Sequence, residues 1–175
     1  FNGSYKINPE VFDCWMNILK QTHKSVLWLY EDNTVASTNL RLEAEKSGIN
    51  PNRIIFAKPL PHAEHLARYR LADLFLDTLP YNAHTTASDA LWVGLPVLTL
   101  IGNSFAGRVA ASLLGALNMN ELITYSRDQY IALATELATN KQKMAIIKEK
   151  LLQNRDIAPL FNTQLFTNNF EKLLC

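Results

Sequence analysis

Three segments of this 175-residue chain combine charged groups, histidines and small polar residues in ways that suit a phosphate-bearing ligand. The first is Asn2-Gly3-Ser4-Tyr5-Lys6, where a glycine-containing loop offers backbone N–H donors and Lys6 adds one positive charge. Such a loop ahead of a helix can receive a phosphate group. A lone glycine-containing loop is a weak motif, and from this segment alone the plainer interpretation, a solvated lysine beside a turn, is favoured.

The second segment runs from Lys58 to Arg68 and carries two histidines on or just before an expected helix. His65 and Arg68 are three residues apart and therefore share one face of that helix. His62, Glu64 and His65 invite a metal-site interpretation, but the two histidines lack a clear third ligand at zinc spacing. A histidine that stacks on a nucleobase, or an ordinary surface histidine, fits the pattern better.

The third segment, His84-Thr85-Thr86, follows a strand-like run and a loop, and Asp89 lies one turn further along. If a helix begins here, its first amides and the threonine hydroxyls face a ligand, an arrangement that suits a diphosphate. Asp89 could then accept hydrogen bonds from ribose hydroxyls. The alternative makes Thr85 or Thr86 an ordinary helix cap and Asp89 a partner of the helix dipole, and the pattern alone favours neither. A helix cap at Thr85 or Thr86 would not account for the histidine at position 84.

Alternating apolar runs and amphipathic segments predict the scaffold that positions these segments. Strands are expected near residues 25–30, 53–57, 74–77 and 96–99, and helices near 9–20, 37–47, 61–71 and 85–93. Four such alternations are typical of an α/β fold with a doubly wound parallel sheet, whose ligands bind at the carboxyl ends of the strands. Beyond residue 106 the pattern turns mostly helical, with segments expected at 109–117, 127–137, 144–152 and 163–174.

Composition argues against several other classes of protein. A net charge of +1 without a local basic stripe gives no support to nucleic-acid binding. The longest apolar run, residues 90–101, contains Gly94 and Pro96 and falls short of the roughly twenty residues that span a bilayer. Cys14 and Cys175 form neither a disulfide framework nor a metal-ligand spacing, so we expect a reducing, cytoplasmic setting. The sequence also lacks the G-x-G-x-x-G fingerprint of a dinucleotide-dependent oxidoreductase.

Together these residues resemble the cytoplasmic O-linked N-acetylglucosamine transferases and their bacterial and SPINDLY-like relatives. The similarity covers almost the whole chain through the motifs Phe1-Asn2-x-x-Tyr5-Lys6-Ile7, Asn52-Arg53-Ile54-Ile55-Phe56, Glu64-His65, His84-Thr85-Thr86-x-x-Asp89-x-Leu91-Trp92, Arg108-Val109-Ala110-Ala111-Ser112 and Pro159-Leu160-Phe161-Asn162-Thr163. The resemblance implies a Rossmann-like α/β domain with a helical C-terminal extension, the C-terminal half of a GT-B glycosyltransferase. In that family the other half and tetratricopeptide repeats usually precede it. We therefore expect residues 1–175 to form one nucleotide-sugar-binding domain of a longer protein, inactive alone.

The resemblance also implies roles for individual residues. Lys6 is similar to the family's lysine that binds the donor diphosphate and stabilises the leaving nucleotide, which makes Lys6 the expected catalytic residue. His65 is similar to the histidine that packs on the nucleobase, Arg68 to the arginine at the base edge, and Asp89 to the carboxylate that holds the ribose. The start of the pyrophosphate-binding helix matches His84, Thr85 and Thr86.

Two positions depart from the animal enzymes of that family. Gly3 stands where they have a glutamine that contacts phosphate, and His62 stands where they have a lysine near the ribose. The resemblance implies an inverting transfer of N-acetylglucosamine from its UDP donor to a Ser or Thr hydroxyl of a protein. No Asp-x-Asp triplet is present, so we expect no metal and no other cofactor. Two alternatives stay open: another donor such as GDP-fucose, or a non-catalytic nucleotide-binding or interaction module.

Overall fold

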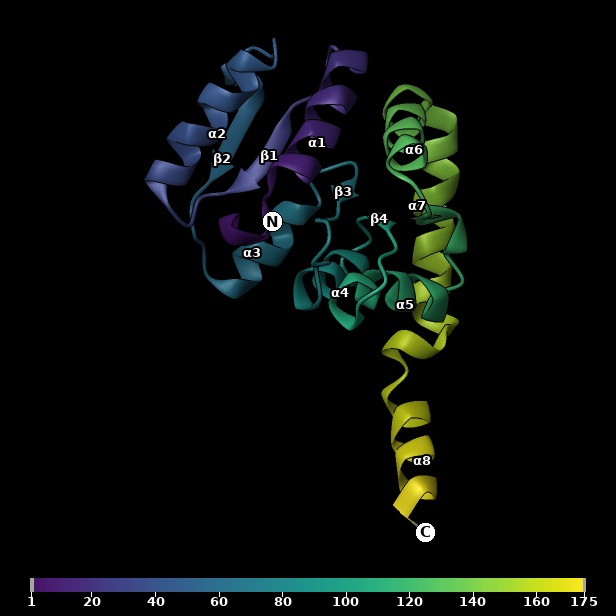
Figure 1. The fold of residues 1–175 in the computed structure, drawn as a ribbon. Helices are drawn as coiled ribbons and strands as arrows, with labels where there is room; N and C mark the ends of the chain where they lie inside the picture. Colours follow the sequence, from purple (N-terminus) through teal and green to yellow (C-terminus); the bar gives the residue numbers. More distant parts are fainter. Residues whose placement is uncertain (1, 175) are drawn as a thin grey trace.

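Parallel strands alternate with helices along most of the computed structural model, which describes residues 2–174 (Figure 1). The longer elements are α1 (Pro9–Gln21), β1 (Leu27–Tyr30), α2 (Thr34–Lys46), β2 (Ile54–Ala57), α3 (His62–Tyr69), β3 (Phe75–Leu76), α4 (Thr85–Trp92), β4 (Val97–Leu100), α5 (Val109–Ala116), β5 (Ile123–Thr124), α6 (Arg127–Thr139), α7 (Lys141–Ile157) and α8 (Thr163–Leu174). Short 3₁₀ turns occupy Ser4–Lys6, Pro51–Arg53, Phe105–Gly107, Asn120–Leu122 and Pro159–Phe161. The predicted α/β class is confirmed.

Every strand pair is parallel, as predicted, but the strands form two separate hydrogen-bonded ladders. β1 pairs with β2, with Leu27 opposite Ile54. β4 lies between β3 and β5 in the second ladder, where Phe75 is opposite Val97. Parallel neighbours require a crossover, and helices α2, α4 and α5 supply it between successive strands.

Some elements begin or end at residues other than those predicted, because side chains cap their first turns, and one strand is too short to be predicted. α2 begins before the predicted residue 37 because the side chain of Asn33 accepts hydrogen bonds from the first helical amides. α7 extends beyond the predicted 144–152, and Asn140 caps its first turn in the same way. The two-residue strand β5 was not predicted, because so short a strand gives no periodic signal.

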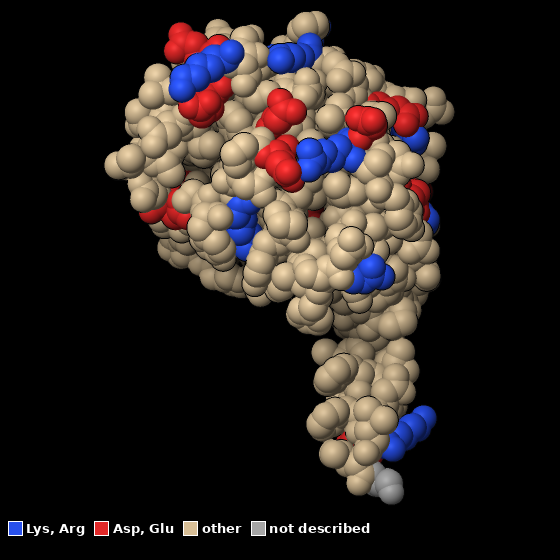
Figure 2. All heavy atoms as spheres, viewed as in Figure 1, with Lys and Arg blue, Asp and Glu red and all other residues tan. Residues whose placement is uncertain are grey.

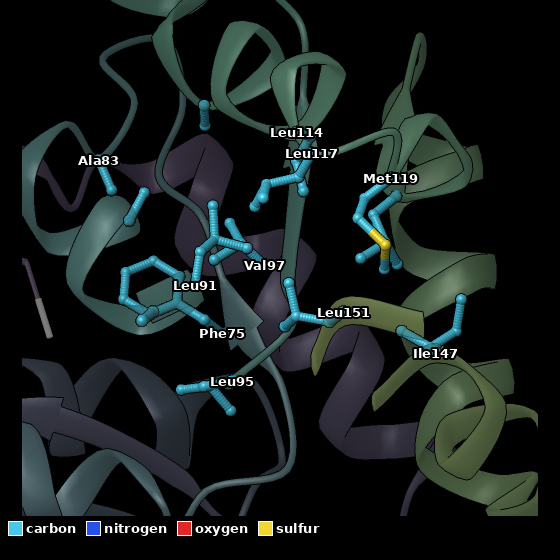
Figure 3. Packing of buried hydrophobic residues seen from close by; sticks show 14 of the residues in the cluster. Phe75, Ala83, Leu91, Leu95, Val97, Leu114, Leu117, Met119, Ile147 and Leu151 are labelled. Carbon is cyan, nitrogen blue, oxygen red and sulfur yellow. The ribbon is translucent and has the colours of Figure 1, made fainter. Parts of the chain in front are cut away.

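Two hydrophobic clusters hold the helices against the strands. The cluster in Figure 3 joins β3, α4, β4, α5 and α7, and Leu91, Val97, Leu114 and Leu151 within it are fully buried. Burial of such a side chain contributes about 1.5 to 3 kcal/mol. The second cluster joins α1, β1 and α6. The N-terminal end of α4 and the loop after β3 are thereby fixed on a rigid support.

The predicted helical C-terminal extension is present as α8, which projects away from the body of the molecule (Figure 1). None of its described residues is buried, and Phe166 and Phe170 stack on its surface. Acidic and basic side chains are mixed over the face seen in Figure 2, without a broad patch of one sign. Within residues 2–174, no helix has both the length and the apolar character that a membrane span needs.

A buried chain of hydrogen bonds ties α1 and α6 to the end of β3. The indole Nε1 of Trp15 donates to the Tyr130 hydroxyl over 3.2 Å. That hydroxyl donates to the backbone carbonyl of Asp77 over 3.0 Å. Burial raises the pKa of Tyr130 well above its ordinary value, so the phenol remains a donor at neutral pH.

Tyr130→Phe should lower the free energy of unfolding by about 1 to 3 kcal/mol, because it leaves the Trp15 N–H and the Asp77 carbonyl buried without this partner. Urea denaturation at neutral pH measures the change. Tyr125→Phe is the matched control, since Tyr125 is 72% exposed, and should change stability by less than about 0.5 kcal/mol. Equal stabilities for the two variants would show that the buried hydroxyl contributes nothing.

Candidate functional site

The first and third polar segments meet through the side chain of Asn2. Its Nδ2 donates to the Thr78 hydroxyl over 3.0 Å, and its Oδ1 accepts from the Thr86 hydroxyl over 2.8 Å. Asn2 therefore joins the N-terminal loop both to the loop after β3 and to the first turn of α4. The hydroxyl of Thr86 is used in this contact.

Lys6 is held against the loop after β3. Its Nζ donates to the backbone carbonyl of Asn82 over 2.9 Å and lies 4.2 Å from the centre of the Tyr81 ring. Burial lowers the pKa of Lys6, and the charge of Asp77 partly offsets that effect. An ammonium group has three donors, and Asn82 accepts from one of them. Lys6 is thus a positioned cation at the mouth of this loop.

The N-terminus of α4 opens toward the same loop. His84 occupies the N-cap position, but its side chain makes no capping hydrogen bond. Instead its ring stacks on Tyr81 with centroids 5.1 Å apart. Thr85 follows as an exposed first residue of the helix. The prediction that a helix begins after His84 is confirmed, and the positive end of its dipole faces the loop that holds Lys6.

The loop after β3 is folded around the carboxylate of Asp77, which is fully buried. Oδ1 accepts from the amides of Thr78 and Ala83 over 2.8 and 2.6 Å, and Oδ2 accepts from the Thr99 hydroxyl over 2.6 Å. Burial raises the pKa of Asp77 to about 7, while these hydrogen bonds and the charge of Lys6 lower it less. One side chain therefore sets the path of the backbone that leads to α4.

On the other side of the site, α3 presents His65 and Arg68 as a coupled pair. Arg68 is 7% exposed, and its Nη1 donates to the carbonyl of Lys58 over 2.6 Å. Its Nη2 contacts Nδ1 of His65. A guanidinium only donates, so Nδ1 accepts and the ring proton lies on Nε2, 3.3 Å from the Tyr69 hydroxyl. Burial, followed by the charge of Arg68, lowers the pKa of His65, which agrees with a neutral ring.

Asp89 links α4 to this pair electrostatically. Asp89 is half-buried in α4; its charge partly offsets the lowering of the pKa of His65, and burial together with that charge raises the pKa of Tyr69. His62, the first residue of α3, is exposed, and its charge is one of the weaker contributions that lower the pKa of His65. Within residues 2–174, no three His, Cys, Asp or Glu side chains are grouped so that they could hold a metal ion.

The sequence-predicted residues therefore fall into two neighbouring groups. The loop after β3 and the start of α4 gather Lys6, His84, Thr85 and Thr86. The surface between α3 and α4 carries His65, Arg68 and Asp89.

Sequence reasoning missed the residues that shape the loop. Asp77 could have been noticed as a carboxylate that ends an apolar strand, where a charge has no solvent and must be satisfied locally. The sequence could not have indicated Asn82. Lys6 donates to its backbone carbonyl, a group that every residue has. Asn2 belongs to the first predicted segment, but the sequence predicts no role for its side chain. Its two hydrogen bonds depend on residues more than seventy positions away.

Parallel strands, helical crossovers and polar loops at the carboxyl ends of the strands define a Rossmann-like α/β domain. Residues 1–170 match the family described as "Glycosyl transferase family 41". The chain belongs to this family.

Similar proteins span the chain almost completely. A Caenorhabditis elegans UDP-N-acetylglucosamine--peptide N-acetylglucosaminyltransferase is 37% identical over 174 residues, 99% of this chain. A probable enzyme of the same name from Arabidopsis thaliana, with the suffix SEC, is 38% identical over 98% of the chain. A probable SPINDLY enzyme from Solanum lycopersicum is 29% identical over 99% of the chain. The chain spans only 15%, 18% and 19% of these three relatives, respectively.

Among solved structures, a mutant O-GlcNAc transferase of Thermobaculum terrenum is similar with a TM-score of 0.93 and 33% identity. It covers 99% of this chain, which corresponds to 34% of that protein. The arrangement of helices and strands described above is therefore that of part of a known transferase structure.

Asp77 should make the stability of the protein depend on pH. Its pKa of about 7 in the folded state exceeds the ordinary value of 3.8, so the folded protein binds the proton more tightly than the unfolded chain. The resulting stability is complete below the ordinary pKa and is lost as pH rises through the folded pKa. Between these values the contribution of Asp77 to the free energy of unfolding should fall by up to about 1.4 kcal/mol per pH unit.

Urea denaturation of wild type, Asp77→Asn and the exposed-site control Asp128→Asn across this pH range tests the assignment. Asp77→Asn should lose this slope, because an amide accepts from Thr78 and Ala83 without titrating, while Asp128→Asn should keep it. A slope that is unchanged in Asp77→Asn would contradict the assignment.

Proposed function

We propose that this chain is the donor-binding half of an inverting protein O-glycosyltransferase. In this proposal N-acetylglucosamine passes from UDP-N-acetylglucosamine to a Ser or Thr hydroxyl of a protein. One observation carries the proposal. In a family 41 chain, Lys6 donates to the carbonyl of Asn82, in the loop that leads into the N-terminus of α4, where no side chain makes a capping hydrogen bond. The curated names of the worm and plant relatives, which specify this donor and a peptide acceptor, support it.

The diphosphate of the donor would lie between Lys6 and the first turn of α4. Both offer positive electrostatic potential and hydrogen-bond donors, which is what two phosphate groups require. During transfer the acceptor oxygen bonds to the anomeric carbon from the face opposite the leaving group. The bond from that carbon to the diphosphate oxygen breaks, the hydroxyl proton is released, and UDP departs with the added negative charge. Lys6 would stabilise that charge as it develops.

The nucleoside would lie along the surface between α3 and α4. A neutral imidazole with a fixed ring proton, as in His65, offers a flat face to the base, and Arg68 holds that ring in place. In this proposal Asp89 would accept hydrogen bonds from the ribose hydroxyls, and His62 would reach the same end of the nucleoside from the start of α3. Because Lys6 and α4 supply the positive potential, the proposal requires neither a metal ion nor another cofactor.

The acceptor side would come from polypeptide outside this chain. The curated relatives devote more than four fifths of their length to other regions, since the chain spans only 15 to 19% of them. The charge pattern of this half suggests no nucleic-acid or membrane partner. We therefore expect the isolated 175-residue chain to bind donor and to transfer no sugar.

UDP titrated into the chain by calorimetry should bind, and His65→Ala should weaken binding by about 5- to 150-fold, the equivalent of 1 to 3 kcal/mol of base stacking. Asp89→Ala should weaken binding by about 10- to 150-fold through lost hydrogen bonds to a charged acceptor. The exposed-site controls His23→Ala and Asp128→Ala should bind as wild type does. GDP as competitor separates the donors: stronger binding of GDP would replace UDP-N-acetylglucosamine by a GDP-sugar such as GDP-fucose.

In the full-length enzyme, Lys6→Ala should lower kcat by about 100- to 1000-fold, the usual cost of removing one donor to a developing negative charge. KM for the donor should change far less, because the interaction strengthens as the bond breaks. Lys24→Ala, an exposed lysine, is the control and should leave kcat unchanged. Turnover near the normal rate in Lys6→Ala would refute the leaving-group role, and absence of turnover in the wild type would favour a non-catalytic module.

A further inference from the structure

The ring of Tyr81 contacts two residues of the candidate site, Lys6 and His84. The Nζ of Lys6 is 4.2 Å from the centre of the ring, a distance at which an aromatic face attracts a cation. The His84 ring stacks on Tyr81 at an interplanar angle of 18°, with centroids 5.1 Å apart. The sequence predicts no role for Tyr81. One ring nevertheless joins the lysine of the N-terminal loop to the histidine at the start of α4.

Several contacts fix the position of this ring. The Thr78 hydroxyl donates to the backbone carbonyl of Tyr81 over 2.7 Å. The amide of the next residue, Asn82, donates to a backbone carbonyl of the loop after β4 over 2.9 Å. The stacked partner His84 is itself contacted edge-on by Phe105, with centroids 6.3 Å apart. The ring of Tyr81 is therefore held through its own backbone and through the residue on which it stacks.

Lys6 needs such a support, because ordering a lysine side chain with its flexible four-carbon stem costs conformational entropy. Lys6 ends a short 3₁₀ turn with no buried residue, and the preceding Tyr5 is 82% exposed. None of the ion pairs among residues 2–174 includes Lys6, and the carboxylate of Asp77, whose charge acts on it, is fully buried. In this part of the chain, the carbonyl of Asn82 and the ring of Tyr81 restrain the ammonium group.

An aromatic ring restrains a cation without neutralising its charge. A carboxylate partner would cancel much of the positive potential that a diphosphate needs. The ring attracts the ammonium group through its quadrupole and carries no net charge. Of the three donors on Lys6, the carbonyl of Asn82 accepts from one. The group can therefore be held in place and still donate to phosphate oxygens.

We propose that Tyr81 is a positioning residue that holds Lys6 ready for the diphosphate and the leaving nucleotide. The inference rests on the proposed function, in which Lys6 stabilises the negative charge that develops as UDP departs. A donor that is aimed before the reaction stabilises that charge without reorganisation, so a loosely held lysine is less effective. Tyr81 acts through Lys6, and the stacked ring of His84 keeps Tyr81 in place.

Two variants in the full-length enzyme separate the ring of Tyr81 from the bulk of its side chain. Tyr81→Leu removes the ring and should lower kcat by about 2- to 30-fold, the range of a cation–π interaction, with a smaller change in KM for the donor. Tyr81→Phe keeps the ring and should retain kcat within about 2-fold of the wild-type value. Tyr125→Leu, at a tyrosine that is 72% exposed, is the control and should leave kcat unchanged.

A double-mutant cycle shows whether Tyr81 acts through Lys6. In the Lys6→Ala background, Tyr81→Leu should lower kcat no further, because the cation that the ring holds is already absent. A merely structural effect of Tyr81→Leu would multiply the loss caused by Lys6→Ala. Such a multiplied loss would overturn the proposal.

The chemical reactivity of Lys6 tests the same contact without sugar transfer. Acetic anhydride acetylates neutral amines, and mass spectrometry of the full-length protein measures the labelling of each lysine. Relative to the exposed Lys24, Lys6 should react about 2- to 30-fold faster in Tyr81→Leu and at the wild-type rate in Tyr81→Phe, because the ring favours the charged ammonium group. Equal labelling of Lys6 in wild type and Tyr81→Leu would contradict the proposal. Absence of transfer by the wild type would instead count against the proposed function, and the labelling would still show whether Tyr81 restrains Lys6.

Discussion

The buried carboxylate of Asp77 is the constraint on which the rest of the site depends. Its oxygens accept hydrogen bonds from two amides of the loop that follows β3 and from Thr99 on β4, while its backbone carbonyl accepts from Tyr130. The loop therefore has one path, and that path places the carbonyl of Asn82 where Lys6 donates to it. The buried side chain of Asp77 thus positions the cation of Lys6. The cost of burying the carboxyl group is visible in its raised pKa.

In the proposed function, the two groups of polar residues around this loop would each bind a different part of the nucleotide sugar. Lys6 and the start of α4 present positive potential, whereas His65, Arg68 and Asp89 offer a flat ring, a buried cation that fixes it, and an acceptor. Both groups sit on helices and loops that the two hydrophobic clusters hold rigid. A site of this kind binds with little reorganisation, which is what stabilisation of a developing charge requires.

The fold class and most elements could be predicted because α1 has helical periodicity and β1 and β4 are short apolar runs typical of buried parallel strands. The division of the strands into two ladders could not be predicted, because pairing depends on which strands meet in space. Motif resemblance selected Lys6, His65, His84 and Asp89, and the structure gathers them on adjoining loops and helices. The contacts of Asn2 and Asp77 join residues distant in sequence, so spacing along the chain carries no trace of them.

A crystal structure of the full-length protein with UDP-N-acetylglucosamine would test the central claim most directly. The proposal predicts diphosphate oxygens within hydrogen-bonding distance of Lys6 Nζ and of the first amides of α4, with the uracil ring against His65 and the ribose hydroxyls at Asp89. A nucleotide bound elsewhere, with Lys6 still donating to Asn82 and no phosphate at the start of α4, would contradict it.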